Sequence, residues 1–177
     1  MEGDWSNAAF WLAADAISPN TVTLTGMNSS SPQGDRAVKG FIDDIRRGSC
    51  VIDAKDTPDI VPILAVVASV SEGTTEIINA GRLRIKESDR LKATAEMLSI
   101  LGADIEEKPE GLVIKGRPSL NGGRVSSSND HRMAMSAAIA SIACRDKVII
   151  DGAEAVNKSY PAFWEDFRAL GGKVELI

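Results

Sequence analysis

Cysteine is scarce in this sequence of 177 residues, and its scarcity excludes a disulfide-stabilised protein. The two cysteines, Cys50 and Cys144, are too few for a disulfide framework, and neither has the spacing of a metal ligand. A chain of this length buries enough surface to fold without such cross-links. We therefore expect two small buried thiols in a reducing cytosol, no metal site and a cytoplasmic location.

Long apolar runs and an excess of positive charge are also missing. No uninterrupted apolar stretch reaches the length of a membrane span, and residues 1–5 lack the basic flank and apolar core of a signal peptide. The net charge of −5 and the scattered Lys and Arg argue against nucleic acid as the main partner. An anionic small molecule stays possible, because a basic pocket can lie inside an acidic protein.

Helices and strands alternate along the chain according to the apolar periodicity. The pattern predicts helices at 5–17, 34–46, 59–70, 87–101, 131–143 and 161–170. It predicts strands at 21–25, from residue 50, and at 74–78, 103–107, 111–115, 124–127, 147–151 and 173–177. Pro109 and Gly111 mark the turn of a hairpin between the fourth and fifth of these strands.

These elements form a unit that is repeated three times. Asp4, Asp59 and Asp130 each stand at or near the start of an Ala-rich, apolar helix, which leads into a strand and then an amphipathic helix. The first unit is shorter than the second. One residue separates Gly48 from Cys50, where the second unit has a hairpin, so a hairpin is missing from the first repeat.

Two of the predicted helices, 59–70 and 131–143, are apolar nearly all the way round, which indicates burial on every side. The usual α/β sandwich places its helices at the surface. We therefore predict one α/β (α+β) domain over residues 1–177, in which three strand–helix–strand–helix repeats, closed by further strands, wrap their sheets around central helices.

The segment at 82–90 holds four cations, Arg82, Arg84, Lys86 and Arg90, before and at a helix N-terminus. This arrangement favours a bound phosphate or carboxylate. The alternative is an ordinary capped and charged first turn, in which Ser88 or Asp89 is the cap.

The single histidine lies in Asn129-Asp130-His131-Arg132, at the start of a second helix. A lone histidine is usually structural, and Asp130 alone could be a helix cap. Burying a carboxylate, an imidazole and a guanidinium at the start of an apolar helix costs free energy if they have no partners. A ligand or an ion pair is therefore expected there.

Two further residues are candidates. Asp59 opens the apolar helix at 59–70, where burial favours a raised pKa and a general-base role. Lys158 lies in a loop before a helix, where solvent-exposed lysines are common. All the charged segments lie at strand–helix junctions, so the three repeats can bring them to one face of the domain.

The chain resembles the 5-enolpyruvylshikimate-3-phosphate synthase family along essentially its whole length. The matching stretches are residues 2–6 (EGDWS), 33–35 (QGD), 56–59 (DTPD), 84–90 (RIKESDR), 129–135 (NDHRMAM) and 158–161 (KSYP). The resemblance implies one of the family's two globular domains, the C-terminal one, which is a threefold array of βαβαββ units with helices packed inside sheets.

The family transfers the enolpyruvyl group of phosphoenolpyruvate to the 5-hydroxyl of shikimate 3-phosphate and releases phosphate, without metal or organic cofactor. By resemblance, Asp59 is the acid–base residue near the 5-hydroxyl, and Glu87 transfers a proton at the methylene carbon. The resemblance also implies that Lys86 contacts shikimate 3-phosphate, that Arg90, Arg132 and Lys158 hold phosphoenolpyruvate, and that His131 supports them.

The resemblance further implies that an N-terminal domain supplies the rest of the active site, so we expect no measurable turnover from this chain alone. Two alternatives remain: half of the related transferase that acts on UDP-N-acetylglucosamine, and a binding or scaffold domain that has kept the fold and lost catalysis. The motifs at 86–90 and 129–135 resemble those of the shikimate pathway enzyme better than those of the transferase that acts on UDP-N-acetylglucosamine. The intact charged motifs disfavour the second.

Overall fold

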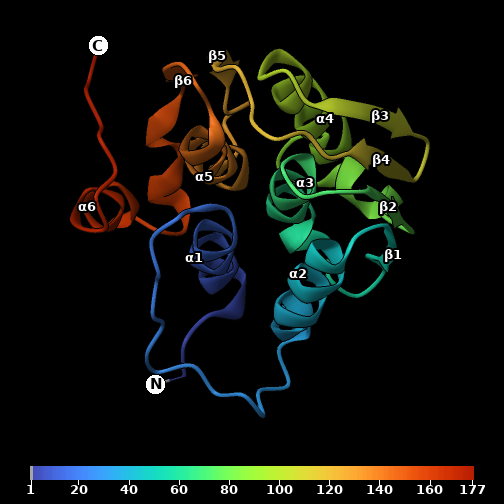
Figure 1. Ribbon diagram of the computed structural model, residues 1–177. Coiled ribbons are helices and arrows are strands. Elements are labelled where there is room, and N and C mark those ends of the chain that lie inside the picture. Colours follow the sequence, from blue (N-terminus) through green and yellow to red (C-terminus); the bar gives the residue numbers. More distant parts are fainter. Residues whose placement is uncertain (1) are drawn as a thin grey trace.

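A computed structural model of the protein describes residues 2–177 and places three apolar helices at its centre (Figure 1). These are α1 (Trp5–Ile17), α3 (Val61–Ser69) and α5 (His131–Ala140), and each of the three packs against the other two. Every residue of α3 is buried, and so is every residue of α5 except Arg132. The prediction of central helices is therefore confirmed.

The outer elements form sheets and amphipathic helices around this centre. The main sheet has the order β1-β2-β4-β3, with β1 parallel to β2 and the other neighbours antiparallel. A second sheet holds the parallel strands β5 and β6. The strands are β1 (Cys50–Asp53), β2 (Thr74–Ile78), β3 (Asp104–Lys108), β4 (Gly111–Lys115), β5 (Gly123–Ser126) and β6 (Val148–Asp151), and the outer helices are α2 (Val38–Arg47), α4 (Arg90–Ile100) and α6 (Phe163–Ala169).

The predicted helices are present, but several begin with a short 3-10 turn. The helix expected at 34–46 consists of η1 (Gly34–Ala37) followed by α2, and the one at 59–70 consists of η2 (Pro58–Ile60) followed by α3. Proline at position 58 suits a first turn, because its missing N–H would have no partner there. Two more turns, η3 (Gly81–Ile85) and η5 (Ala153–Lys158), precede the helices α4 and α6.

Two predicted strands, 21–25 and 173–177, are wrong: neither segment forms a ladder. Residues 21–25 keep the alternating exposure of a strand, with Val22 and Leu24 packed on the core. In the complete second repeat, β4 lies between β2 and β3. Residues 2–177 contain no counterpart of β4 in the first or the third repeat, so neither segment has a neighbouring strand there with which to form a ladder.

The gap in the first repeat is visible in the structure. Helix α2 ends at its cap Gly48, and β1 begins at Cys50. In the second repeat the corresponding connection carries the hairpin β3–β4, which packs on α3 and α4. The first repeat therefore lacks its hairpin, as predicted.

The two cysteines are free thiols, as expected, but both are half-buried instead of fully buried. Burial raises the pKa of the Cys144 thiol to about 11. Within residues 2–177, no group of three or more His, Cys, Asp or Glu is placed to hold a metal ion. The same part of the chain has no helix that is long and apolar enough to cross a membrane.

Candidate functional site

The charged residues singled out in the sequence meet where the central helices begin. Asp130 caps α5 by accepting a hydrogen bond of 2.9 Å from the backbone N–H of Arg132. Asp4 caps α1 in the same way. Asp59 differs from both, because it lies in η2 and forms ion pairs instead of capping α3. Since helix N-termini carry partial positive charge, this end of the molecule suits carboxylates and other anions.

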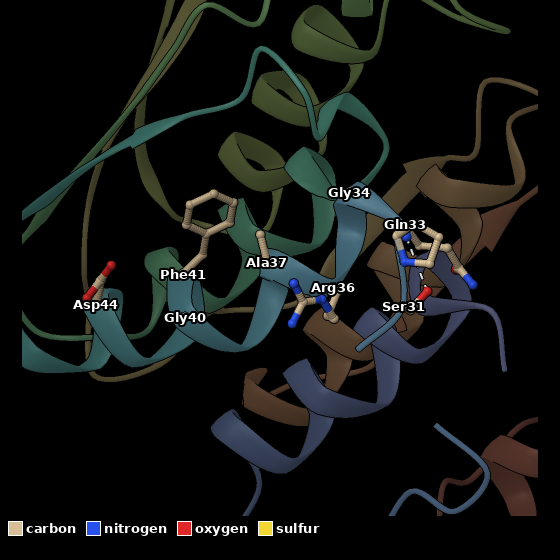
Figure 2. Close-up of a pocket in the computed structure, with 9 residues that line it drawn as sticks. Ser31, Gln33, Gly34, Arg36, Ala37, Gly40, Phe41 and Asp44 are labelled. Atoms are coloured by element: carbon tan, nitrogen blue, oxygen red, sulfur yellow. Dashed lines mark hydrogen bonds between the residues drawn. The ribbon is translucent and has the colours of Figure 1, made fainter. Parts of the chain in front are cut away.

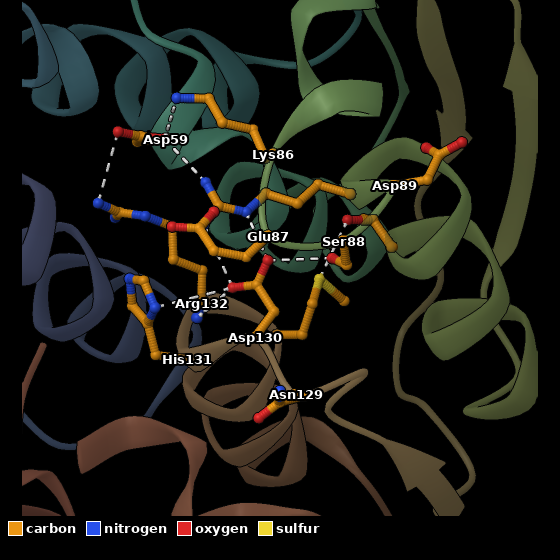
Figure 3. A network of polar contacts seen from close by, with 12 residues as sticks. Asp59, Lys86, Glu87, Ser88, Asp89, Asn129, Asp130, His131 and Arg132 are labelled. Atoms are coloured by element: carbon orange, nitrogen blue, oxygen red, sulfur yellow. Dashed lines mark hydrogen bonds and ion pairs between the residues drawn. The ribbon is translucent and has the colours of Figure 1, made fainter. Parts of the chain in front are cut away.

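Arg90 is the centre of the cluster, and its side chain is 1% exposed (Figure 3). Its Nε donates to Asp130 Oδ2 at 2.7 Å, its Nη1 donates to Asp59 Oδ1 at 2.8 Å, and its Nη2 donates to Glu87. Asp130 is fully buried, so this is a salt bridge inside the protein. One guanidinium therefore holds three carboxylates from three separate segments in one arrangement.

Asp59 and Glu87 are the two carboxylates of this arrangement that reach solvent. The side chain of Asp59 is 31% exposed and that of Glu87 is 46% exposed. Lys86 forms a second ion pair with Asp59, with its Nζ 3.2 Å from Oδ1. Both carboxylates can thus exchange protons with a bound molecule while Arg90 fixes their positions.

The expected raised pKa of Asp59 is wrong. Burial does raise the pKa of this carboxyl, but the charges of Arg132, Lys86 and Arg90 outweigh it and hold the pKa below its ordinary value. The sequence shows the apolar helix after Asp59, but it does not show three cations that come from other segments. Asp59 is therefore ionised at neutral pH and can accept a proton.

The side chains of Arg132 and His131 are nearly buried, but they have few close polar contacts. The guanidinium of Arg132 lies 3.6 Å from Asp59 Oδ2, and its Nη1 is buried without a hydrogen-bond partner among residues 2–177. His131 Nδ1 likewise lacks a partner in that part of the chain, and it is 4.0 Å from Asp130 Oδ1. Unpaired buried nitrogens of this kind are costly, so they are suited to a ligand that completes their hydrogen bonds.

Lys158 lies at the rim of the cluster. Its Nζ donates to the backbone oxygen of Asn129 at 2.6 Å and to its side-chain oxygen at 2.9 Å. Ser128 and Asn129 both have positive φ angles, 52° and 55°, which cost energy for residues other than glycine. The loop before α5 is therefore in a strained conformation, to which Lys158 is hydrogen-bonded.

The sequence suggested that the four cations at 82–90 act as one group, and the structure shows that they do not. Arg84 donates to Asp89 and to the carbonyl oxygens of Lys108 and Pro109, so it ties α4 to the hairpin. Asp89 is the cap of α4, as one alternative predicted, and accepts from the backbone N–H of Lys92. The residues of this segment that the structure brings into the cluster are Lys86, Glu87, Ser88 and Arg90.

The sequence predicts Ser88 only as a possible helix cap and assigns no role to Asp35. Ser88 donates to Asp130 Oδ2 at 3.0 Å. Asp35 accepts a hydrogen bond from Ser6 and lies near enough to Arg132 and Asp59 for their charges to act on its pKa. The signal for Asp35 in the sequence is the segment 33–35, which resembles the family.

A solvent-open groove of about 480 Å³ lies beside this region, between residues 31–34 and α2 (Figure 2). Gln33, Arg36 and Phe41 are among its lining residues, and none of the charged residues of the cluster is. We therefore place the candidate site at the charged cluster, where the titratable groups converge, and not in this groove.

The cluster makes the fold sensitive to acid. Burial and the charge of Arg132 lower the pKa of His131 below 6.5, so the unfolded chain takes up this proton at a higher pH than the folded one. The free energy of unfolding should therefore fall as the pH drops below about 6.5, by up to about 1.4 kcal/mol per pH unit until the folded-state pKa is reached. Urea unfolding between pH 8 and pH 5 tests this. The decline should shrink in a His131→Gln variant, and an equal decline in both proteins would contradict the assignment.

The family described as EPSP synthase (3-phosphoshikimate 1-carboxyvinyltransferase) matches residues 46–167, which include every predicted site residue. A curated 3-phosphoshikimate 1-carboxyvinyltransferase of Clostridium kluyveri is 47% identical over 191 residues, which cover 99% of this chain and 45% of that protein. The protein of the same name from Clostridium acetobutylicum is 50% identical over 188 residues, covering 98% of this chain and 44% of its own.

Solved structures agree with the fold. An EPSP synthase structure from Acinetobacter baumannii superposes with a TM-score of 0.91 at 26% identity and covers 99% of this chain and 47% of its own. A second structure from the same organism gives a TM-score of 0.89 at 24% identity. The chain thus spans about half the length of the relatives it matches. The match to the C. kluyveri protein extends over 191 residues, more than the 177 of this chain.

Proposed function

Because the chain belongs to the EPSP synthase family, we propose that its charged cluster is half of the active site for enolpyruvyl transfer to shikimate 3-phosphate. In this reaction, which belongs to the shikimate pathway of aromatic amino acid biosynthesis, phosphoenolpyruvate donates the enolpyruvyl group and phosphate is released. The observation that carries the proposal is the pair of solvent-reaching carboxylates, Asp59 and Glu87, that Arg90 holds side by side.

The two carboxylates have complementary tasks in the proposed reaction. Asp59, which is ionised, accepts the proton of the 5-hydroxyl as that oxygen bonds to C2 of phosphoenolpyruvate. Glu87 in its protonated form gives a proton to the methylene carbon C3, and a tetrahedral adduct results. In the second step Glu87 takes a proton back from C3 while the C2–phosphate bond breaks, and Asp59 returns its proton to the departing phosphate.

The cations hold the anionic reactants in this proposal. Lys86 contacts shikimate 3-phosphate, and Arg132 and Lys158 bind phosphoenolpyruvate. The unpartnered Nη1 of Arg132 supports its part, since a phosphate or carboxylate oxygen is the acceptor that it lacks among the described residues. His131 supports Arg132 from the adjacent position. The proposed chemistry uses no metal and no organic cofactor.

Arg90 has a more limited part than the resemblance implies. Its guanidinium is buried and already donates to three carboxylates. Nη2 donates to Glu87, the more exposed of the two carboxylates that reach solvent, so in this proposal phosphoenolpyruvate reaches Arg90 by displacing Glu87 from that nitrogen. We therefore propose that Arg90 mainly positions Asp59 and Glu87, and that it contacts phosphoenolpyruvate through Nη2.

The other half of the relatives' length is proposed to supply the remaining contacts. The candidate site lies on an open face here, whereas the reaction requires water to be excluded around the adduct. We propose that an N-terminal domain closes over this face, that this chain has no measurable turnover by itself, and that the complete enzyme works in the cytoplasm.

The alternative that the chain is a scaffold makes a different prediction for binding. A half-site that keeps Lys86 should bind shikimate 3-phosphate weakly, with a Kd on the order of 1 mM, and a Lys86→Ala variant should lose that binding. Isothermal titration calorimetry at low ionic strength measures both. Lys92→Ala is the matched control, because Lys92 is an exposed lysine of α4 that lies outside the cluster. Binding that is absent, or equal in all three proteins, would favour the scaffold.

A further inference from the structure

Asn129 and Lys158 lie on the segments that follow two neighbouring parallel strands. Strand β5 ends at Ser126 and β6 ends at Asp151, and these two residues are paired in the sheet. The chain after β5 runs to Asn129, and the chain after β6 runs through η5 to Lys158. Segments that leave the carboxyl ends of parallel strands meet at one edge of the sheet, where many α/β proteins bind their ligands.

The two segments contact each other through Ser127, which is buried. Its backbone N–H donates to the carbonyl oxygen of Asp151 at 2.9 Å, and its hydroxyl accepts a hydrogen bond of 3.2 Å from the backbone N–H of Asn129. The same hydroxyl lies so close to Gly152 that a Cβ added there would be 2.5 Å from it. Ser127 therefore fixes the backbone of Asn129 relative to the start of η5.

Asn129 presents two oxygen atoms to the ammonium group of Lys158. The Nζ atom of Lys158 is 2.6 Å from the backbone oxygen and 2.9 Å from Oδ1, and it donates to both. The φ angle of Asn129 is 55°, in the left-handed region that asparagine tolerates better than most residues other than glycine. A lysine has three N–H donors on a flexible side chain. Two bonds to one residue restrict that side chain and leave one donor for a ligand.

We propose that Asn129 is a positioning residue that orders the side chain of Lys158 for the binding of phosphoenolpyruvate. This inference rests on the proposed role of Lys158. If Asn129 served only the turn, glycine in its place would leave binding unchanged, because glycine adopts a positive φ without strain. If its oxygens competed with the anion for Lys158, the loss of Oδ1 would tighten binding. If Asn129 orders Lys158, glycine keeps the turn but loses Oδ1, and binding weakens because the side chain must be ordered by the ligand.

Titration of the full chain with phosphoenolpyruvate, followed by NMR, tests the proposal. We expect Asn129→Gly to raise the Kd about threefold and to leave thermal unfolding nearly unchanged. Adding Asn129→Gly to Lys158→Ala should cause no further change in the Kd. Asn79→Gly is the matched control and should leave the Kd unchanged. Asn79 follows β2 with a similar φ of 57°, but its side chain is hydrogen-bonded to Asp53 and not to a cation of the site.

The order of the Lys158 side chain is an independent readout that needs no ligand. NMR relaxation of its Cε methylene group should show lower order in Asn129→Gly and the original order in Asn79→Gly. Unchanged order in Asn129→Gly would overturn the inference, and so would unchanged or tighter binding in Asn129→Gly together with weaker binding in Lys158→Ala. If Lys158→Ala leaves the binding unchanged, the proposed function of Lys158 is wrong, and the relaxation measurement alone then decides whether Asn129 orders it.

Discussion

Replacing Asp130 by asparagine is expected to lower the free energy of unfolding by about 3 kcal/mol. Asp130 is fully buried and accepts two hydrogen bonds from Arg90, whose side chain is 1% exposed. The substitution removes the charge that compensates a buried guanidinium and keeps nearly the same side-chain volume. The loss lies at the low end of the range for broken buried ion pairs, because Asp59 and Glu87 still accept from Arg90.

Asp4→Asn is the matched control for this prediction. Asp4 caps α1 as Asp130 caps α5, but it is exposed to solvent. Asparagine caps helices about as well as aspartate, so this change should cost less than about 0.5 kcal/mol. Equilibrium unfolding in urea measures both variants. If the two losses were equal, the contribution of Asp130 would come from capping, and the buried ion pair would contribute nothing.

Replacing Glu87 by glutamine is expected to lower kcat by a factor of about 100 to 10,000 when this chain is combined with an N-terminal half. The amide oxygen can still accept from Arg90, so the geometry of the cluster is retained. What is lost is the proton transfer at the methylene carbon, which affects the chemical step and leaves the binding of both substrates nearly unchanged.

The matched control is Glu96→Gln, an exposed position on α4 whose partner is Lys92. Its kcat should equal that of the unchanged chain. If Glu87→Gln raised the KM for phosphoenolpyruvate and left kcat unchanged, Glu87 would be a binding residue, and the assigned proton transfer would be wrong.

The sequence correctly predicts those elements of the fold whose own residues have a distinctive apolar pattern. The apolar helices at 59–70 and 131–143 stand out because burial on all sides requires apolar residues all round. Residues 21–25 and 173–177 have the alternation of strands but form none, since a strand needs a neighbour for its backbone groups. The alternation of side chains does not reveal whether that neighbour exists.

The candidate site, too, is only partly predictable from the sequence. The sequence identifies Asp59, Lys86, Glu87, Arg90, His131 and Arg132, which the structure brings together, and Lys158, which it places at the rim. It fails where the outcome depends on distances between repeats. The lowered pKa of Asp59 comes from cations of two other segments, and the burial of Arg90 comes from its pairing with Asp130. Asp35 was missed because only the packing of η1 on α1 shows which residues it faces.

The release of phosphate from phosphoenolpyruvate and shikimate 3-phosphate tests the central proposal most directly. The assay compares this chain alone, a separately produced N-terminal half alone, and their mixture. Turnover in the mixture and in neither half alone, lowered by a factor of about 100 or more by Glu87→Gln and unchanged by Glu96→Gln, is the predicted result. No turnover in a mixture whose N-terminal half is active with the C-terminal half of a relative would contradict the proposal, and would show that the charged cluster of this chain is not a competent half of the active site.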